Sequence, residues 1–337
     1  MERARIHWQG PSWLVTLALG CADPQASTGT PAPDSPGGMA GSSAVSSDEL
    51  LSGTGLYLSD MRTLAPDIQR FTPAHALWAD GAEKERFVYL PPDSTIDTSD
   101  PDAWRYPVGT KLWKSFDLDG KRIETRLLEK RPAGWFMMAY LWRESGADAD
   151  AVPDGRVDAL GTGHDVPNED ACGSCHLLEH DVVLGFSAVQ LARAGDGVSL
   201  AELHEAGRLS SSVPSRELPG NATAQAALGY LHANCGSCHR PRSRVFDEQT
   251  RVDLWLTLGA LDALEVTPTF TSTVGQATML SDDPELMLVE PGEPEASALW
   301  LRMAARDRRG MPPLASEQVD GDGLDLIAAF IQALEVP

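Results

Sequence analysis

The feature that most constrains this chain is a pair of identical pentapeptides, Cys-Gly-Ser-Cys-His, at residues 172–176 and 235–239. Two cysteines separated by two residues and followed at once by a histidine form the attachment signal for c-type haem. In this signal both thiols form thioether bonds to the haem, and the histidine gives an imidazole nitrogen to the iron. The chain is therefore expected to fold around two covalently attached haem c groups. The predicted attachment residues are Cys172, Cys175, Cys235 and Cys238, with His176 and His239 as iron ligands.

Cys-x-x-Cys pairs also occur in four-cysteine zinc sites and in thioredoxin-like redox centres. Neither requires a histidine after the second cysteine, and this chain has only 8 histidines in 337 residues. At that composition, a histidine after both pairs by chance has a probability on the order of one in two thousand. The gap of roughly sixty residues between the pairs is also long for a zinc ribbon, whose usual gap is about 15 to 20. Covalent haem is therefore the preferred interpretation of both motifs.

The N-terminal segment predicts export, which agrees with haem attachment outside the cytoplasm. Residues 1–21 combine two arginines with a short apolar run, the organisation of a signal peptide. Residues 17–21 resemble a bacterial lipobox, which makes Cys21 the predicted lipidated first residue of the mature protein. An ordinary signal peptide cut nearby is the alternative. Residues 22–50 are mostly small or polar and predict a flexible tether, because they cannot bury enough apolar surface to offset the entropy of ordering.

Residues 51–165 contain no cysteine and have the periodicity of strands, so we expect a β-rich module there. Residues 86–90 predict a strand that two prolines stop, and Asp119-Gly120 marks a hairpin turn. Residues 122–127 alternate charged with uncharged side chains, so one face of this strand is expected to be buried and the other wet. Residues 135–142 are apolar on both faces, as in a central strand that is covered on each side.

Helical periodicity dominates the last third of the chain. Segments 224–234, 295–306 and 322–334 each place apolar side chains on one stripe. The order of helix, haem motif, loop, helix, methionine loop and terminal helix is that of a class I cytochrome c domain, which we expect at 224–337, after a first haem segment at 166–223. The expected fold class is α+β and multi-domain, with a β-rich N-terminal module followed by mainly α-helical cytochrome c-like haem domains.

Met311 is the predicted sixth iron ligand of the second haem. It precedes Pro312 and Pro313, which restrict the backbone and present the thioether from a stiff loop just before the last helix. A methionine in this place is hard to explain by packing alone. Three other methionines are weaker candidates, because they lie in an irregular stretch or on an apolar helix stripe, where methionine usually belongs to the core. They are Met279, Met287 and Met303.

The first haem has no local methionine, since none occurs between Met138 and Met279. His164 and His204 are the possible sixth ligands that lie nearest in sequence without an evident obstacle. Alternatively, no protein group binds there, and an open position on the iron would allow peroxide chemistry. His180 lies too close to His176 to reach the opposite side of the haem, and His232 is expected on a helix surface. Further donors that could reach in from the β-rich module are His75, Met137 and Met138.

The formal charge of −22 argues against nucleic acid as a partner, because a phosphate backbone requires a basic surface. The expected partner is a redox protein, with membrane contact only through the lipid anchor. Four arginines gather before Met311 in this otherwise acidic chain, and we expect part of this cluster to face haem propionates or an acidic redox partner. They are Arg302, Arg306, Arg308 and Arg309.

Beyond the two motifs, six segments resemble bacterial periplasmic dihaem c-type cytochromes that place a β-rich module before two Cys-x-x-Cys-His motifs. The resemblance covers nearly the whole chain after residue 55, and it implies haem binding and electron transfer. It also supports Met311 as a ligand by position, and it specifies neither a substrate nor the sixth ligand of the first haem. The segments are 77–84, 107–114, 124–127, 184–191, 228–234 and 291–294, with Arg302-Met303 before Met311.

The predicted function is therefore that of a periplasmic, membrane-tethered dihaem cytochrome that transfers electrons. A dihaem peroxidase-type oxidoreductase, in which one haem has an open site, is the first alternative. A haem sensor or ligand-binding protein is the second.

Overall fold

The structure is a computed structural model that describes residues 48–177, 180–193, 195–243, 245–246, 250–279, 286–313 and 316–335. The predicted signal peptide, the predicted lipidation residue Cys21 and nearly all of the predicted tether lie outside these residues. Within them, no helix combines the length and the apolar character that a membrane crossing requires.

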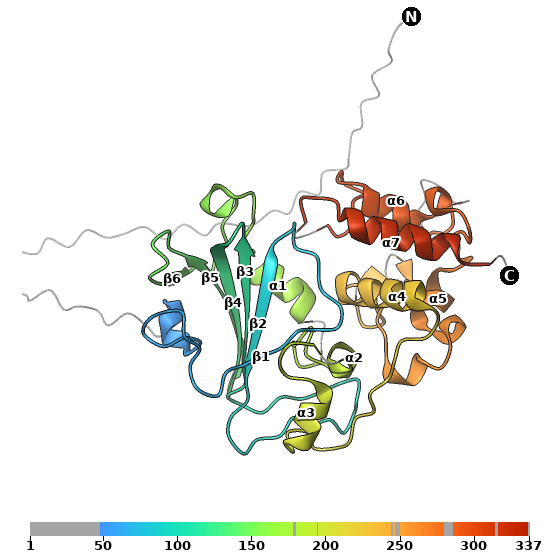
Figure 1. The fold of residues 1–337 in the computed structure, drawn as a ribbon. Helices are drawn as coiled ribbons and strands as arrows, with labels where there is room; N and C mark the ends of the chain where they lie inside the picture. Colours follow the sequence, from blue (N-terminus) through green and yellow to red (C-terminus); the bar gives the residue numbers. More distant parts are fainter. Residues whose placement is uncertain are drawn as a thin grey trace, which may run out of the picture. The chain divides into compact units, whose positions relative to one another are not determined.

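An antiparallel sheet of six strands occupies the first half of the described chain, and each strand pairs with the next one in sequence (Figure 1). Asp119 and Gly120 connect two strands with φ angles of 50° and 75°, as a tight hairpin turn requires. The predicted hairpin and the strand that stops before Pro91 are confirmed. The strands are β1 Gln69–Arg70, β2 Glu83–Tyr89, β3 Lys111–Leu118, β4 Lys121–Arg131, β5 Gly134–Trp142 and β6 Ala149–Ala151.

The two faces of the sheet differ in what they carry. On one face Phe87, Trp113 and Leu127 lie opposite one another across β2, β3 and β4, and they pack against the short 3-10 helix η1 (Leu51–Thr54). The other face, here called the motif face, carries Arg86, Lys114 and Arg126. It adjoins α1 (Glu169–His176), which contacts β5. The first Cys-x-x-Cys-His motif lies on this helix.

The remaining helices are short, apart from two. In Figure 1, α4 and α7 lie side by side, with α6 next to them. Both α4 and α6 contact α7, and apolar residues of the three helices form one cluster. α4 ends at the second motif, and the helices predicted at 224–234, 295–306 and 322–334 are confirmed within a few residues. The helices are α2 Ala188–Leu191, α3 Leu200–Glu205, α4 Ala222–Asn234, α5 Pro268–Thr273, α6 Ala298–Ala304 and α7 Gly321–Gln332. Single-turn 3-10 helices occur at Ala159–Gly161, Leu258–Ala260, Leu264–Val266 and Pro294–Ala296.

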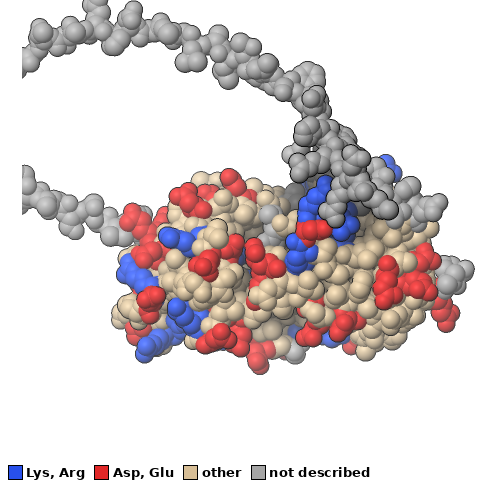
Figure 2. Space-filling view, turned by 90° about the horizontal axis from the view of Figure 1, so that it is seen from above, with Lys and Arg blue, Asp and Glu red and all other residues tan. Residues whose placement is uncertain are grey.

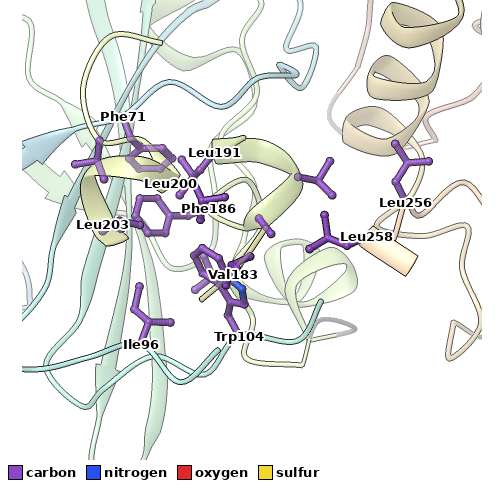
Figure 3. Close-up of a cluster of buried hydrophobic side chains, with 14 of the residues drawn as sticks. Phe71, Ile96, Trp104, Val183, Phe186, Leu191, Leu200, Leu203, Leu256 and Leu258 are labelled. Carbon is purple, nitrogen blue, oxygen red and sulfur yellow. The ribbon is translucent and has the colours of Figure 1, made fainter. Parts of the chain in front are cut away.

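One apolar cluster joins the sheet to the helices, and it overturns the predicted fold class (Figure 3). It contains Val88 of β2, Trp104 of a loop, Phe186 before α2, Leu203 of α3 and Leu256 beyond the second motif. The described residues belong to one compact unit. The prediction of a separate β-rich module followed by mainly α-helical cytochrome c-like domains is therefore wrong. Sequence periodicity identifies elements, but it does not show which elements share a core.

The charged face of β4 was predicted to be exposed to water, and this prediction is wrong for Glu124. Glu124 is completely buried on the motif face, where it pairs with the guanidinium of Arg126 at 2.5 Å and with His164 Nε2 at 2.9 Å. A charge that is paired and hydrogen-bonded can be buried, and alternation in the sequence does not show this partner. Both faces of β4 are covered as a result.

Candidate functional site

The first motif is presented by the last turns of α1. Asn168 caps this helix, and its side chain accepts a hydrogen bond from the backbone N–H of Ala171, which satisfies one of the free N–H groups of the first turn. Cys172, Cys175 and His176 then follow on the helix that adjoins the sheet. The sheet thus sets the position of the first motif.

His176 is oriented through one of its two ring nitrogens. Its Nδ1 lies 2.6 Å from the carbonyl oxygen of Val182, so Nδ1–H donates to that oxygen and Nε2 is left as the metal-binding atom. Burial lowers the pKa of His176 to about 4, and the imidazole is therefore neutral, as ligation requires. A histidine that ligates a metal usually donates its other N–H in this way.

The backbone that accepts this bond is strained and anchored. Val182 has a φ of 53°, a left-handed conformation that is an outlier for a β-branched residue. The preceding Asp181 accepts hydrogen bonds from the backbone N–H of Tyr106 at 2.6 Å, from Lys130 Nζ at 2.6 Å and from Trp135 Nε1 at 2.7 Å. Two of these donors belong to the sheet, so the sheet fixes Asp181, and Asp181 fixes the carbonyl that orients His176.

The second motif begins where α4 ends. Cys235 is the C-cap of this helix, and its N–H donates to Leu231 at 2.9 Å. Gly236 lies so close to its surroundings that a Cβ would be 2.7 Å from the carbonyl oxygen of His232 and 2.8 Å from that of Leu254. Only glycine fits between the two cysteines in this packing. The Nδ1 atom of His239 is buried and has no hydrogen-bond partner among the described residues.

The two motifs lie near each other. The thiols of Cys175 and Cys238 influence each other, and this interaction raises the pKa of Cys175 and lowers that of Cys238 to about 6. The hydroxyl of Ser237 also lies 3.9 Å from the sulfur of Cys238. None of the four motif cysteines is in a disulfide. The sequence indicates a separate segment for each motif, and it does not predict that the two motifs lie near each other.

Met311 lies across a cavity from the second motif. Cys235, Met303, Met311 and Pro312 line this cavity together with Trp78, Tyr230, Asn234, Arg306 and Asp320, and its volume is about 10 Å³. Met311 belongs to the loop that precedes α7. The loop is held from behind, because Met311 N–H donates to Arg302 at 2.9 Å and Arg306 donates to the Met311 carbonyl at 3.3 Å.

The arginines of the predicted cluster have different partners. Arg306 is turned toward backbone oxygens, and it also donates to Gln318 at 2.9 Å, so it stabilises the Met311 loop from both ends. Arg302 donates to the carbonyl of Arg309, whose guanidinium pairs with Asp307. Within the described residues these three arginines have local partners.

A segment of the N-terminal half clamps the same loop. In this segment, the 76–80 strap, Trp78 N–H donates to Asn234 at 2.7 Å, directly before Cys235. Asp80 accepts from the N–H groups of Glu317 and Gln318 at 3.0 Å, just beyond Met311. The strap thus connects the end of α4 to the Met311 loop. The resemblance named above includes this segment, but its role was not predicted.

The predicted histidine ligands of the first haem are occupied or remote. His164 is buried, its Nε2 is hydrogen-bonded to Glu124, and its ring packs against Phe116 at 5.3 Å. His204 is exposed on α3, and no contact between it and either motif is found among the described residues. Met137 and Met138 point to opposite faces of β5, so only Met137 lies on the motif face.

Two further histidines have structural partners. The imidazole of His75 lies against Gly229 of α4, where a Cβ would be 1.9 Å from its Nδ1 atom. His232 is not on a helix surface as expected: it is buried, and its Nδ1 accepts from the N–H of Leu256 at 3.1 Å.

The residues present fit two covalently bound haem groups by their chemistry. Each motif offers two thiols and a neutral histidine, and a thioether faces the second motif. Over the described part of the chain, no three His, Cys, Asp or Glu side chains are grouped so as to hold a metal ion by themselves. Comparisons with family models, with curated proteins and with solved structures found no match to this chain.

Proposed function

We propose that this protein is an exported dihaem c-type cytochrome that transfers electrons to or from a redox partner protein. One haem is attached at Cys172 and Cys175, and the other at Cys235 and Cys238. His176 and His239 are the proximal iron ligands. A lipid on Cys21 would hold the protein at a membrane.

The two Cys-Gly-Ser-Cys-His motifs carry this proposal, and the interaction between Cys175 and Cys238 supports it by placing the motifs near each other. Groups attached to neighbouring residues lie close together, and electron exchange between two centres is fast only over short distances. A shared four-cysteine metal site would also bring the pairs together, but over the described part of the chain no three such side chains are grouped to hold a metal ion. The sequence signal and this interaction thus support the same function from independent sides.

Bound haem iron supplies one-electron redox chemistry, and the chain's own residues set its conditions. The Val182 carbonyl orients His176 and makes its Nε2 a stronger donor. Met311 would give its thioether to the second iron, and a methionine ligand raises the reduction potential. The second haem would then be the centre of higher potential.

The first experiment is expression with a haem-attachment system, followed by a pyridine haemochrome assay and intact mass. We expect two haems per chain in the wild type and one in each of C172A/C175A and C235A/C238A. The matched controls S174A and S237A change the residue between the same cysteines and should keep both haems. Bound zinc in place of covalent haem in the wild type would refute the proposal.

A second candidate function is peroxide reduction at the first haem. It is favoured because His164, the predicted sixth ligand nearest in sequence, is hydrogen-bonded to Glu124 and is therefore not free to bind the first iron. Low-temperature EPR distinguishes the two functions. Two low-spin signals support electron transfer alone, whereas one high-spin signal that peroxide abolishes supports an enzyme.

A further inference from the structure

Three cations lie in line on the motif face of the sheet. Arg86 of β2 is directly opposite Lys114 of β3, and Lys114 is directly opposite Arg126 of β4. We call these three residues the cationic row. Like charges at directly opposed positions destabilise a sheet, and this chain has a formal charge of −22. Figure 2 shows many acidic side chains interspersed with fewer basic ones on the molecule's surface. A row of cations on a covered sheet face therefore needs an explanation.

Only one end of the row is neutralised. Arg126 pairs with Glu124 at 2.5 Å. Within the described residues, the side chains of Arg86 and Lys114 make no hydrogen bond or ion pair, and the Lys114 ammonium lies 4.7 Å from the centre of the Phe116 ring. Burial lowers the pKa of Arg86 to about 10, and burial together with the neighbouring cations lowers that of Lys114. Both cations are thus partly buried without an anion as a direct partner among the described residues.

The row lies beside the first motif. Burial is the main reason why the pKa of His176 is lowered, and the positive charges of Lys114 and Arg126 lower it further. The charge of Arg126 also lowers the pKa of the Cys172 thiol, and Cys172 and Cys175 in turn raise the pKa of Arg126. α1 contacts β5, and Arg126 lies directly opposite Ala139 of β5, so the row adjoins the helix that carries the first motif. The cations come from the sheet rather than from this helix.

We propose that the cationic row is the receptor for the propionate carboxylates of the first haem, with Arg86 and Lys114 as the two groups that bind them. This inference rests on the proposed function. A haem carries two carboxylates, and the row offers two cations without partners. Hydrogen bonds between ionised partners are roughly twice as strong as neutral ones, and an arginine can hold a carboxylate with two of them. The sheet then forms one wall of the first haem site, and the propionates supply the charge that the row lacks.

The test compares R86Q/K114M with K121M, which removes an exposed lysine from the β3–β4 turn of the same sheet. Both are purified as holoproteins, and the haemochrome assay must give two haems per chain. An EPR-monitored redox titration then follows each haem separately. Removal of nearby cations favours the oxidised state, so we expect the equilibrium constant for reduction of one haem to fall about tenfold, which is about 59 mV for one electron. The other haem and both haems of K121M should be unchanged.

A second readout reports the contact itself. The propionate bending bands in the resonance Raman spectrum of the first haem should shift in R86Q/K114M and stay in place in K121M. If the double variant does not fold, the charge-conserving variants R86K and K114R are used, and each should shift these bands while it changes the potential less. Two haems with unchanged potentials and bands would overturn this inference and leave the proposed function intact. A wild-type chain without covalent haem would overturn both.

Discussion

The two Cys-Gly-Ser-Cys-His motifs are identical in sequence, but the residues that surround them offer different parts of a ligand environment. Around the first motif, the proximal side is complete, because the Val182 carbonyl orients His176 and Asp181 ties that carbonyl to the sheet. His164, the predicted sixth ligand that lies nearest in sequence, is hydrogen-bonded to Glu124. Around the second motif, Met311 faces Cys235 across a cavity, while the Nδ1 atom of His239 is buried without a partner among the described residues. A short attachment signal therefore leaves the ligand environment to the surrounding fold.

The largest effect is expected from M311A. Loss of the thioether should convert the second haem from low spin to high spin and remove the weak far-red sulfur-to-iron band, while the first haem keeps its spectrum. M279A is the matched control, since Met279 is 57% exposed. Optical and EPR spectra of both variants decide the matter. A retained far-red band in M311A would mean that another methionine binds this iron.

The next effect concerns the anchor of the first motif. D181N keeps the shape of the side chain but leaves Lys130 without its charge partner, and the free energy of unfolding should fall by about 2–3 kcal/mol. The EPR signal of the first haem should broaden, because the Val182 carbonyl is no longer fixed, and that of the second should not.

The control for this variant is D150N, which breaks an ion pair with Arg143 whose members are 51% and 45% exposed. Exposed pairs contribute only about 0–1 kcal/mol. Denaturant unfolding of the two variants gives the comparison. Equal losses in D181N and D150N would show that Asp181 is not an anchor.

A smaller effect is expected from the 76–80 strap. Asn replaces Asp80 without backbone strain at its φ of 50°, but D80N exchanges one acceptor oxygen for an amino group that cannot accept from Gln318. The Met311 loop should open more often, so imidazole should replace Met311 several-fold faster in stopped-flow mixing. D67N, at another exposed position with positive φ, is the control and should exchange at the wild-type rate.

The smallest effects are expected from the two predicted histidine ligands. H164Q weakens one buried hydrogen bond and should cost about 1 kcal/mol of stability, without any change in the EPR signal of the first haem. H204Q changes an exposed side chain and should alter neither stability nor spectra. A change from low spin to high spin in either variant would identify that histidine as the sixth ligand and remove the contrast between the two motifs.

Local features of this fold could be predicted from the sequence, because they depend on neighbouring residues. The Asp119-Gly120 turn, the strand before Pro91 and the stripe of apolar residues in α7 are of this kind. The shared core was not predictable in this way, since Trp104 and Leu256 lie in loops without periodicity. The same holds for the buried side of β4, where the partner of Glu124 is His164, 40 residues away.

The candidate site divides along the same line. The motifs and Met311 carry their own signal, and the structure places Met311 opposite Cys235. Val182 and Asp181 carry none, because a valine with positive φ and an aspartate with three donors are recognised only when the fold is known. The cationic row is an intermediate case. The alternation at residues 122–127 predicts that Arg126 lies on the charged face of its strand, but only the register places Lys114 and Arg86 beside it.

The interaction between Cys175 and Cys238 has a consequence for how the protein is made. In an oxidising compartment, two free thiols near each other are in position to form a disulfide, which would block both motifs at once. In an exported cytochrome of the kind proposed, maturation would therefore run ahead of folding. Each cysteine would be attached to haem, or kept reduced, before α1 and the end of α4 come together. The final packing of the two halves would then report that both attachments have been completed.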